Sequence, residues 1–572
     1  MKLYSKTTLA ALAAALMSST SAFAESLPVF KVAPAANSET AMKAHQEMFG
    51  APPATRKGAQ GVVSPIDSRA AKAVETGLKL QSAGKVVEVD RRSGHMFIAD
   101  MDRLWRGDGA KLPSDGDAVR IAEEFVGKLN LLPKDNYVMP RMVGLSETAM
   151  INDEPGAAKI VLDRQVNYGF DINVDGRAIP VVGGGGQIKV TIGDQGKIIG
   201  LMGGWRPIQV VAEKVEIVPA EKAIENWKAS AQGAKISNVK ASLAYYAAPG
   251  FEEQAVLAPV WVLSGETEIA GRPGPIRKQI VAATAQYGPA YPSAPKVNPR
   301  VFKPQDAIRK QIMPRGDDDG RGASLLDLVI SPAYAQSSRE CGTSWIGESQ
   351  GLGGSSGNSR GFVNQCKAQG WNVNFDWGDN NAWETDWRSD DDGYVDAADL
   401  VFYTGHASPW GWNLASPDDG SLDNSEVGGA SDLYGQQDLE WFIVAACGPH
   451  QHDGFVGSIG NAFDRWRDTF DGLHAFMGYG AVTFDNTSEG NRFMELARSG
   501  WGLIDAWFRT AQEIQPATNG EPAPNGDAIF VTAMYAHNGD RCARNEKLPG
   551  FGPQCTDVRG SGQRRTLMWS GT

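Results

Sequence analysis

Two short apolar segments in the last third of the chain each end beside a side chain that can do chemistry. Residues 399–406 end in His406, and residues 439–448 contain Cys447 near their end. A nearby imidazole can accept the proton of a thiol, because only the thiolate is a good nucleophile, and can return a proton to a leaving amine. The pair therefore predicts acyl transfer, with Cys447 as the nucleophile and His406 as the general base and acid.

Both segments are near-continuous runs of apolar, β-branched and aromatic residues, which is typical of parallel strands buried on both faces. Ligands of open parallel sheets bind beyond the carboxyl ends of the strands. We therefore expect both side chains at one rim of a sheet. The small residues Gly405, Ala407 and Gly448 leave room for a substrate, and the backbone amides of Ala407 and Cys447 are candidates for binding an oxyanion.

Other interpretations of these residues stay open. Cys447 is also compatible with an inert core thiol, and the same fold is compatible with a non-enzymatic binding protein of the cell envelope or exterior. Residues 447–453 hold a thiol, two imidazoles (His450 and His452) and the carboxylate of Asp453, so a metal-dependent hydrolase is a third hypothesis. Their spacing matches no common zinc signature.

An acidic loop offers a further, weaker possibility. Calcium favours clustered oxygen ligands, although the spacing here is not that of an EF-hand and a solvated loop is the simpler interpretation. The acidic residues of this loop are Asp386, Asp390, Asp391, Asp392 and Asp396. We expect no other cofactor.

Composition narrows the class of protein. The net charge is −12, which disfavours nucleic acid or an anionic membrane as the main partner. Residues 1–24 have a basic start, a short apolar run and a small-x-small cleavage site, the pattern of a signal peptide. We find no later apolar stretch of the roughly 20 residues that a membrane span needs. The sequence therefore predicts an exported protein, periplasmic or extracellular.

All five cysteines lie in the C-terminal part. Nearest-neighbour pairing joins Cys341 to Cys366 and Cys542 to Cys555 and leaves Cys447 over. Export favours such disulfides, but the sequence cannot fix the connectivity.

The length predicts several domains. We divide the chain into a signal peptide (1–24), a flexible lead-in (25–76), small α+β modules (77–285), a Pro-rich linker (286–338) and an α/β domain (339–572). The expected elements include a hairpin over 85–100, a helix over 117–130 capped by Ser114 or Asp115, strands over 187–192, 197–201 and 473–480, and helices over 220–227 and 489–511. The glycine run 183–186 lacks the Lys and Ser/Thr of a P-loop and indicates a bulge or a close approach.

Several phrases of the N-terminal half resemble PepSY-type propeptide domains. They are residues 176–182, the glycine run, the turn at Asp194-Gln195-Gly196 and residues 203–207. The resemblance implies a module that precedes a secreted peptidase and acts as a folding helper or inhibitor. A generic ligand-binding accessory domain is the alternative.

The segments around His406 and Cys447 resemble the caspase-like cysteine peptidases, the clan of caspases, legumain, clostripain and gingipains. In that clan one strand ends in His-Gly, and a later one ends in a small residue followed by Cys. The resemblance implies a mostly parallel sheet flanked by helices, with His406 as base and Cys447 as nucleophile. Ala407 stands where the clan has glycine, which leaves the oxyanion geometry open. Residues 380–386, 402–407 and 478–481 also resemble an uncharacterised family of secreted bacterial proteins without an assigned activity.

The sequence thus predicts a secreted cysteine endopeptidase that acts on a peptide or protein. We expect it to be made as a zymogen, inhibited by its N-terminal half and released by cleavage in the linker. The oligomeric state is left open.

Overall fold

The computed structural model describes residues 25–33, 37–50, 79–291, 299–300 and 339–572, apart from short gaps at 83, 91, 135, 232–233, 270–271, 274–276, 290, 416, 418, 429–431, 456–458, 520–527 and 553. The expected signal peptide and most of the predicted linker lie outside these ranges. No helix in the described part of the chain is long and apolar enough to cross a membrane.

The C-terminal half is built on a mostly parallel sheet. Its parallel strands follow the order β16-β15-β17-β21-β22, and two antiparallel strands, β23 and β24, extend it. The bounds are β15 (Glu340–Trp345), β16 (Asn372–Gly378), β17 (Leu400–Thr404), β21 (Trp441–Ala445), β22 (Ala475–Tyr479), β23 (Phe530–His537) and β24 (Arg564–Gly571). A small second sheet holds β18 (Ala407–Ser408), β19 (Gly411–Asn413) and β20 (Ser421–Asp423). The expectation of a mostly parallel α/β sheet in this half is confirmed.

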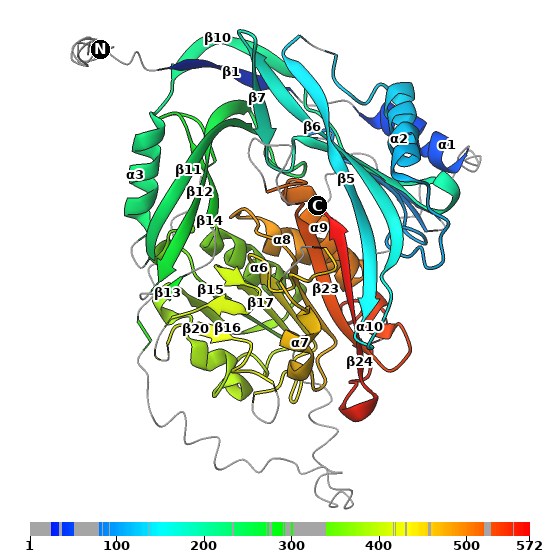
Figure 1. Ribbon diagram of the computed structural model, residues 1–572, viewed down its shortest axis with the longest axis vertical. Helices are drawn as coiled ribbons and strands as arrows, with labels where there is room; N and C mark the ends of the chain where they lie inside the picture. Colours follow the sequence, from blue (N-terminus) through cyan, green and yellow to red (C-terminus); the bar gives the residue numbers. More distant parts are fainter. Residues whose placement is uncertain are drawn as a thin grey trace, which may run out of the picture.

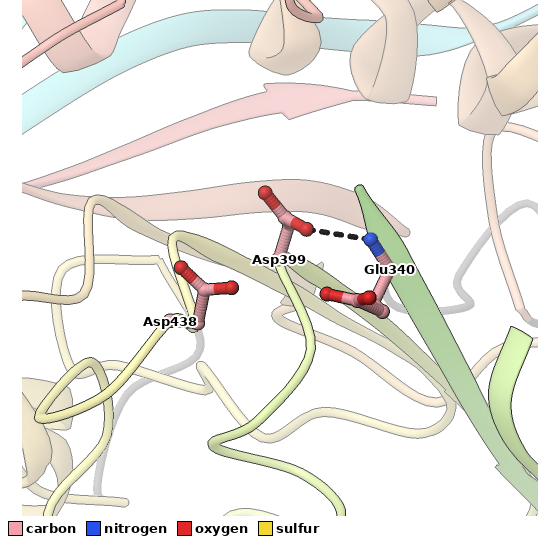
Figure 2. A group of neighbouring side chains, drawn as sticks. All are labelled: Glu340, Asp399 and Asp438. Carbon is pink, nitrogen blue, oxygen red and sulfur yellow. Dashed lines mark hydrogen bonds between the residues drawn. The ribbon is translucent and has the colours of Figure 1, made fainter. Parts of the chain in front are cut away.

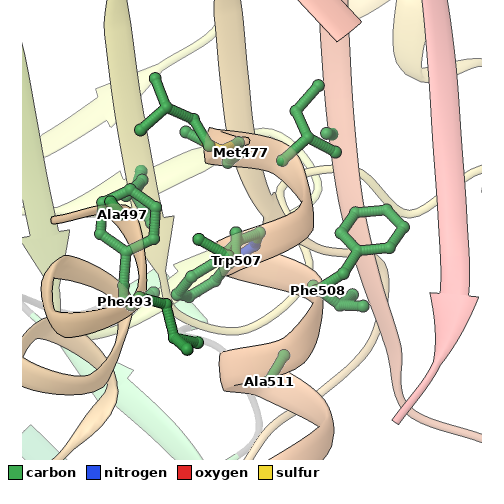
Figure 3. Packing of buried hydrophobic residues seen from close by; sticks show 14 of the residues in the cluster. Met477, Phe493, Ala497, Trp507, Phe508 and Ala511 are labelled. Carbon is green, nitrogen blue, oxygen red and sulfur yellow. The ribbon is translucent and has the colours of Figure 1, made fainter. Parts of the chain in front are cut away.

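Helices cover both faces of this sheet, which explains why its central strands β17 and β21 are almost wholly apolar. Leu400 and Phe402 of β17 belong to one hydrophobic cluster, and Val401 and Tyr403 belong to another. The first cluster includes side chains of α6, α8 and α9, part of which Figure 3 shows. The helices are α6 (Ser355–Gln369), α7 (Ala462–Trp466), α8 (Glu489–Ala497), α9 (Leu503–Ile514) and α10 (Cys542–Asn545).

The single helix predicted over 489–511 is wrong, because the structure has two helices there. Gly500 lies between them with φ of +84°, in the left-handed region that favours glycine. The turn lets α9 pack its own apolar face, with Trp507 and Phe508 fully buried.

The N-terminal half continues the same sheet. Strand β5 pairs antiparallel with β24, and the sheet then runs through β6, β8, β9, β4, β3 and β2. Figure 1 shows β5 and β24 side by side, although they come from opposite halves of the chain. Their bounds are β2 (Lys79–Ser82), β3 (Lys85–Val89), β4 (Met96–Asp100), β5 (Val138–Asn152), β6 (Ile160–Val174), β8 (Gln187–Ile192) and β9 (Ile198–Gly203).

A second layer of strands stands beside this extension. Strand β7 pairs with both β6 and β11, and β12 joins β11 to β14 and β1. The bounds are β1 (Ser26–Val32), β7 (Arg177–Val182), β10 (Ile208–Glu216), β11 (Ala234–Tyr246), β12 (Val256–Ile269), β13 (Arg272–Pro273) and β14 (Arg277–Ala282), with helices α1 (Ser38–Phe49), α2 (Asp115–Leu129) and α3 (Ala220–Ser230).

The local predictions for this half are confirmed. The hairpin is β3–β4, and Ser114 caps α2 by accepting a hydrogen bond from the backbone N–H of Asp117. The strands predicted over 187–192 and 197–201 are β8 and β9, and the helix predicted from 220 is α3.

The expectation of a flexible lead-in over 25–76 is wrong for its first part. Strand β1 pairs with β10 and β12, and Phe30 is fully buried against the ring of Tyr245. Helix α1 follows. The Ala- and Pro-rich composition hid these elements, because they are stabilised by distant strands and not by local periodicity. Residues 51–76 lie outside the described ranges.

The two halves share one hydrophobic core. Phe97, Leu104 and Trp105 from the N-terminal half lie in the same buried cluster as residues of β17, β21 and α9. The glycine run also contacts the other half: a Cβ on Gly184 would lie 1.9 Å from the carbonyl oxygen of Glu513. The predicted close approach is confirmed, and the predicted linker does not separate two independent sheets.

Candidate functional site

The parallel register brings the two predicted reactive side chains to one place. Thr404 at the end of β17 pairs with Ala445 at the end of β21. His406 and Cys447 each follow the end of their strand by two residues. They line one small cavity of about 20 Å³. The rim expected from the sequence therefore exists, and both side chains lie on it.

The sulfur of Cys447 is a free thiol that contacts Thr483. The Thr483 amide nitrogen lies 3.5 Å from the sulfur, its carbonyl oxygen 3.7 Å and its hydroxyl 3.8 Å. Burial raises the pKa of the thiol above its ordinary value, and the bonds from Thr483 and the charge of Lys278 offset this only in part. In this state Cys447 is a protonated thiol at neutral pH.

The imidazole of His406 is buried and has a contact of its own. Its Nε2 lies 3.4 Å from the backbone carbonyl oxygen of Gln350, in the loop after β15. The side-chain oxygen of Gln350 accepts a hydrogen bond from Asn413 at 3.1 Å. Gln350 thus contacts the segment that carries His406 through both its backbone and its side chain. It lies at the switch point of the sheet, between β15 and β17, where open α/β sheets bind ligands.

The small residues around the pair are closely packed, and Gly405 also lines the small cavity. A Cβ on Gly405 would lie 2.3 Å from the Tyr403 hydroxyl. Gly448 has φ of +65°, and a Cβ there would meet the Gln451 side chain at 2.3 Å. Ala407 is buried in β18 and pairs with Trp412. An oxyanion role for the amides of Ala407 and Cys447 stays a prediction.

The N-terminal half closes one side of this site. Lys278 of β14 lines the small cavity together with His406 and Cys447. Asp485, after β22, accepts a hydrogen bond from the Gly354 amide at 2.8 Å and one from Gln279 of β14 at 3.5 Å. Strand β14 thus forms one wall of the small cavity and is hydrogen-bonded to Asp485.

A larger cavity of about 380 Å³ adjoins the site, and both are lined by Phe484, Asp485 and Asn486. Its other residues come from both halves, among them Tyr246, Glu252, Tyr287, Tyr291, Ser488 and Gln515. No local sequence pattern pointed to Lys278, Gln350 or Thr483, since they come from segments far from both strands. Asp485 is polar and follows a strand of the sheet, which is the only local signal for any of them.

The side chains of residues 447–453 do not converge on a metal. The Nδ1 of His450 lies 2.9 Å from the Thr532 hydroxyl, and the burial of this ring lowers its pKa to about 3. His452 accepts a hydrogen bond from the Gly454 amide. Asp453 accepts bonds from two backbone amides of its own loop. Within the described ranges these residues form no group of three ligands, so the structure does not support this metal hypothesis.

The acidic loop does not gather into a calcium site either. Asp386 binds Arg300, and Asp396 accepts bonds from the amides of Gly435 (2.5 Å) and Gln437 (2.9 Å). Burial raises the pKa of Asp396 to about 8. Asp390, Asp391 and Asp392 also belong to no ligand group in the part of the chain that the structure describes.

One acidic group of three does occur among the described residues, at the opposite ends of the strands. Glu340, Asp399 and Asp438 face one another in Figure 2. Arg339 lies 2.5 Å from Asp399, and the Glu340 amide donates to the same carboxylate at 2.6 Å. Burial nevertheless raises the pKa of Asp399. These contacts tie the segment before β15 to the amino ends of the strands, far from His406 and Cys447.

The cysteines pair as nearest neighbours. The structure has disulfides between Cys341 and Cys366 and between Cys542 and Cys555. Cys447 is the free cysteine among the described residues. Two disulfides agree with an oxidising, extracytoplasmic environment.

Comparison with known proteins adds one family match. Residues 342–571 match the model of a domain of unknown function, DUF6345. This is less than half of the chain, and it contains the whole rim with His406 and Cys447. No curated protein matches the chain.

Among solved structures, an uncharacterised protein from Eubacterium rectale ATCC 33656 is similar over 46% of this chain and 86% of its own, with 10% identity and a TM-score of 0.24. A score this low does not establish a shared fold.

Proposed function

We propose that the C-terminal half is a caspase-like cysteine peptidase that the structure holds in a closed state. The observation that supports this most is the presence of a free thiol and an imidazole in one cavity at the carboxyl ends of two paired parallel strands. The strand order also supports it, because the loops of β15 and β17 diverge at the same rim.

The reaction would use these two groups in sequence. His406 takes the proton of Cys447, and the thiolate attacks the carbonyl carbon of the scissile bond. The tetrahedral intermediate collapses as His406 gives its proton to the leaving amine. Water, activated by the same imidazole, then hydrolyses the thioester and regenerates both groups.

The closed state needs to open before this chemistry starts. A cavity of about 20 Å³ has room for about one water molecule. The raised pKa of Cys447 also leaves too little thiolate for rapid attack. We therefore expect low activity in the intact chain and higher activity once the contact with β14 is loosened.

The test is hydrolysis of a mixed peptide library before and after limited proteolysis of the linker, with Cys447→Ala and His406→Ala. Both variants should lose hydrolysis and labelling by an acyloxymethyl ketone probe. The matched control is His537→Ala, which removes a histidine bonded to Thr566 at the other edge of the half. Folded protein without any Cys447-dependent turnover, in either form, would sink the proposal.

A second candidate is a binding protein, which the large cavity favours. About 380 Å³ is within the range of ligand pockets. In that case a ligand would bind equally well to wild type and to Cys447→Ala, and neither protein would turn over any peptide.

A further inference from the structure

An arginine of the linker sits in a pocket made wholly by the C-terminal half. The side chain of Arg300 is 12% exposed. Its guanidinium carbon lies 4.0 Å from the ring centre of Trp383, 4.3 Å from that of Trp377 and 5.1 Å from that of Tyr394. We call these three rings and Asp386 the arginine cage.

Asp386 closes the cage with a two-pronged ion pair. Its two oxygens lie 2.5 and 2.9 Å from the two terminal nitrogens of Arg300, and its side chain is fully buried. The carbonyl oxygen of Asn381 accepts a third hydrogen bond from the guanidinium at 2.9 Å. The side-chain oxygen of Asn381 accepts a hydrogen bond from the backbone N–H of Arg300 at 2.8 Å. Arg300 thus makes four hydrogen bonds to Asp386 and Asn381 of the C-terminal half.

The cage is shaped for a guanidinium and not for an ammonium. Only a planar fork bonds both oxygens of one carboxylate while its face lies against aromatic rings. A lysine would keep one bond and part of the cation–π attraction. The chemical class of ligand is therefore arginine.

The cage also lies on the same rim as the candidate dyad. Trp377 is near the carboxyl end of β16, whose last residue, Gly378, pairs with the last residue of β15. The loop after β16 is connected to the histidine through a second loop. Asp379 accepts hydrogen bonds from the backbone amides of Gly347 and Ser349. These two residues belong to the loop that carries Gln350, whose carbonyl oxygen contacts His406.

We propose that the arginine cage is a substrate subsite of the peptide groove, and that Arg300 occupies it as an intramolecular stand-in for an arginine of the substrate. This rests on the proposed peptidase function. Two to three strand spacings separate β16 from β17 and β21, about 10 to 14 Å. An extended peptide covers this in about three to five residues. Preferred substrates then carry arginine about that far from the scissile bond.

The experiment measures binding without turnover. Fluorescein-labelled peptides with arginine, lysine or citrulline at one position are titrated into Cys447→Ala protein, alone and combined with Arg300→Ala. Removing Arg300 removes a competitor tethered to the cage, so the arginine peptide should bind about tenfold tighter or more. The lysine and citrulline peptides should bind at least about tenfold weaker than the arginine peptide.

Two further variants complete the design. Asp386→Asn should abolish the preference for arginine, and Arg141→Ala, which breaks an ion pair with Asp171 in the N-terminal half, should leave it unchanged. If Arg300→Ala does not fold, ethylguanidinium is added to restore it, and Arg300→Lys replaces it in the titration. Equal binding of the three peptides by the folded variant with its cage empty would overturn the proposal and leave Arg300 as an anchor only.

The outcome is separable from that of the peptidase. Selective arginine binding combined with no Cys447-dependent hydrolysis by wild type, either intact or nicked in the linker, would contradict the proposed function alone. Hydrolysis without arginine selectivity would contradict the subsite alone.

Discussion

Cutting the linker should leave the two halves bound to each other. Strand β5 pairs with β24 over Thr148–Asn152, inside the continuous sheet. Buried hydrogen bonds cross this junction: Ser570 bonds Thr148 at 2.9 Å and accepts from Gln165 at 2.8 Å. A nick between residues 301 and 338 breaks none of these contacts. We therefore expect both fragments to elute together at the mass of the uncut protein.

Trp105 gives this expectation a magnitude. Its side chain is 1% exposed and meets Phe508 of α9 edge to face, with ring centres 5.7 Å apart, and its carbonyl accepts a bond from Arg544. Truncating a buried tryptophan to alanine costs about 3–5 kcal/mol. At 1.4 kcal/mol per decade, the nicked Trp105→Ala protein should dissociate at concentrations about two to three and a half orders of magnitude higher.

The assay is size-exclusion chromatography with light scattering, on nicked protein diluted from micromolar to nanomolar concentrations. A specific protease site inserted into residues 301–338 provides the nick. Met142→Ala is the control, because that side chain is 47% exposed on β5. Separation of nicked wild type at micromolar concentration, or no effect of Trp105→Ala, would refute the idea that this core holds the halves together.

Three further predictions concern the thiol, a buried carboxylate and a disulfide. Burial raises the pKa of Cys447, so its alkylation by iodoacetamide should be slower than that of a free cysteine at pH 7 and should still rise above pH 9; a plateau near pH 7 would contradict this. Glu513 is buried between Arg492 and Arg509, which hold its pKa below the ordinary 4.5. Glu513→Gln should cost about 3–5 kcal/mol. A depressed pKa stabilises the fold above pH 4.5 and is lost on acidification, so the Tm of wild type should fall more steeply below pH 4.5 than that of the variant; parallel curves would argue against the ion pairs. Replacing Cys542 and Cys555 by serine opens a short loop and should remove about 3 kcal/mol, seen as a lower Tm. A reducing agent should then lower the Tm by less than in wild type, because the Cys341–Cys366 disulfide alone remains; an unchanged Tm of the variant would contradict this.

The strands of the rim were predictable because their signal is local. Residues 400–404 and 441–445 are buried on both faces, so they are apolar or aromatic at every position except Thr404, and the sheet has them in parallel register. The side chains at their ends then share a rim as a matter of geometry. The hairpin over 85–100 and the cap at Ser114 followed from turn and capping chemistry for the same reason.

What the sequence did not reveal depends on contacts between distant segments. The pairing of β5 with β24 joins residues more than 400 positions apart, and no local pattern records such a partner. The same holds for β1, which is stabilised by β10 and β12. Within the site, Gln350 and Lys278 take their positions from loops and strands that the chain brings in from elsewhere. Motif reasoning therefore found His406, Cys447 and the neighbouring Gly405 but neither of these two residues.

The continuity of the sheet restricts how the site can open. An N-terminal half that shares strand pairs and a core with the C-terminal half is not a detachable cap. Removing it whole would expose Trp501 and Phe508, which pack against Phe97 and Trp105, and would unpair β24. The contacts that close the cavity come from a much smaller region, around Lys278 and Gln279 of β14. A shift of β14 away from Asp485 would open the wall beside Cys447 and join the small cavity to the large one, while the β5–β24 seam stays intact. Opening of the site therefore depends on movement of β14 and does not require release of the N-terminal half.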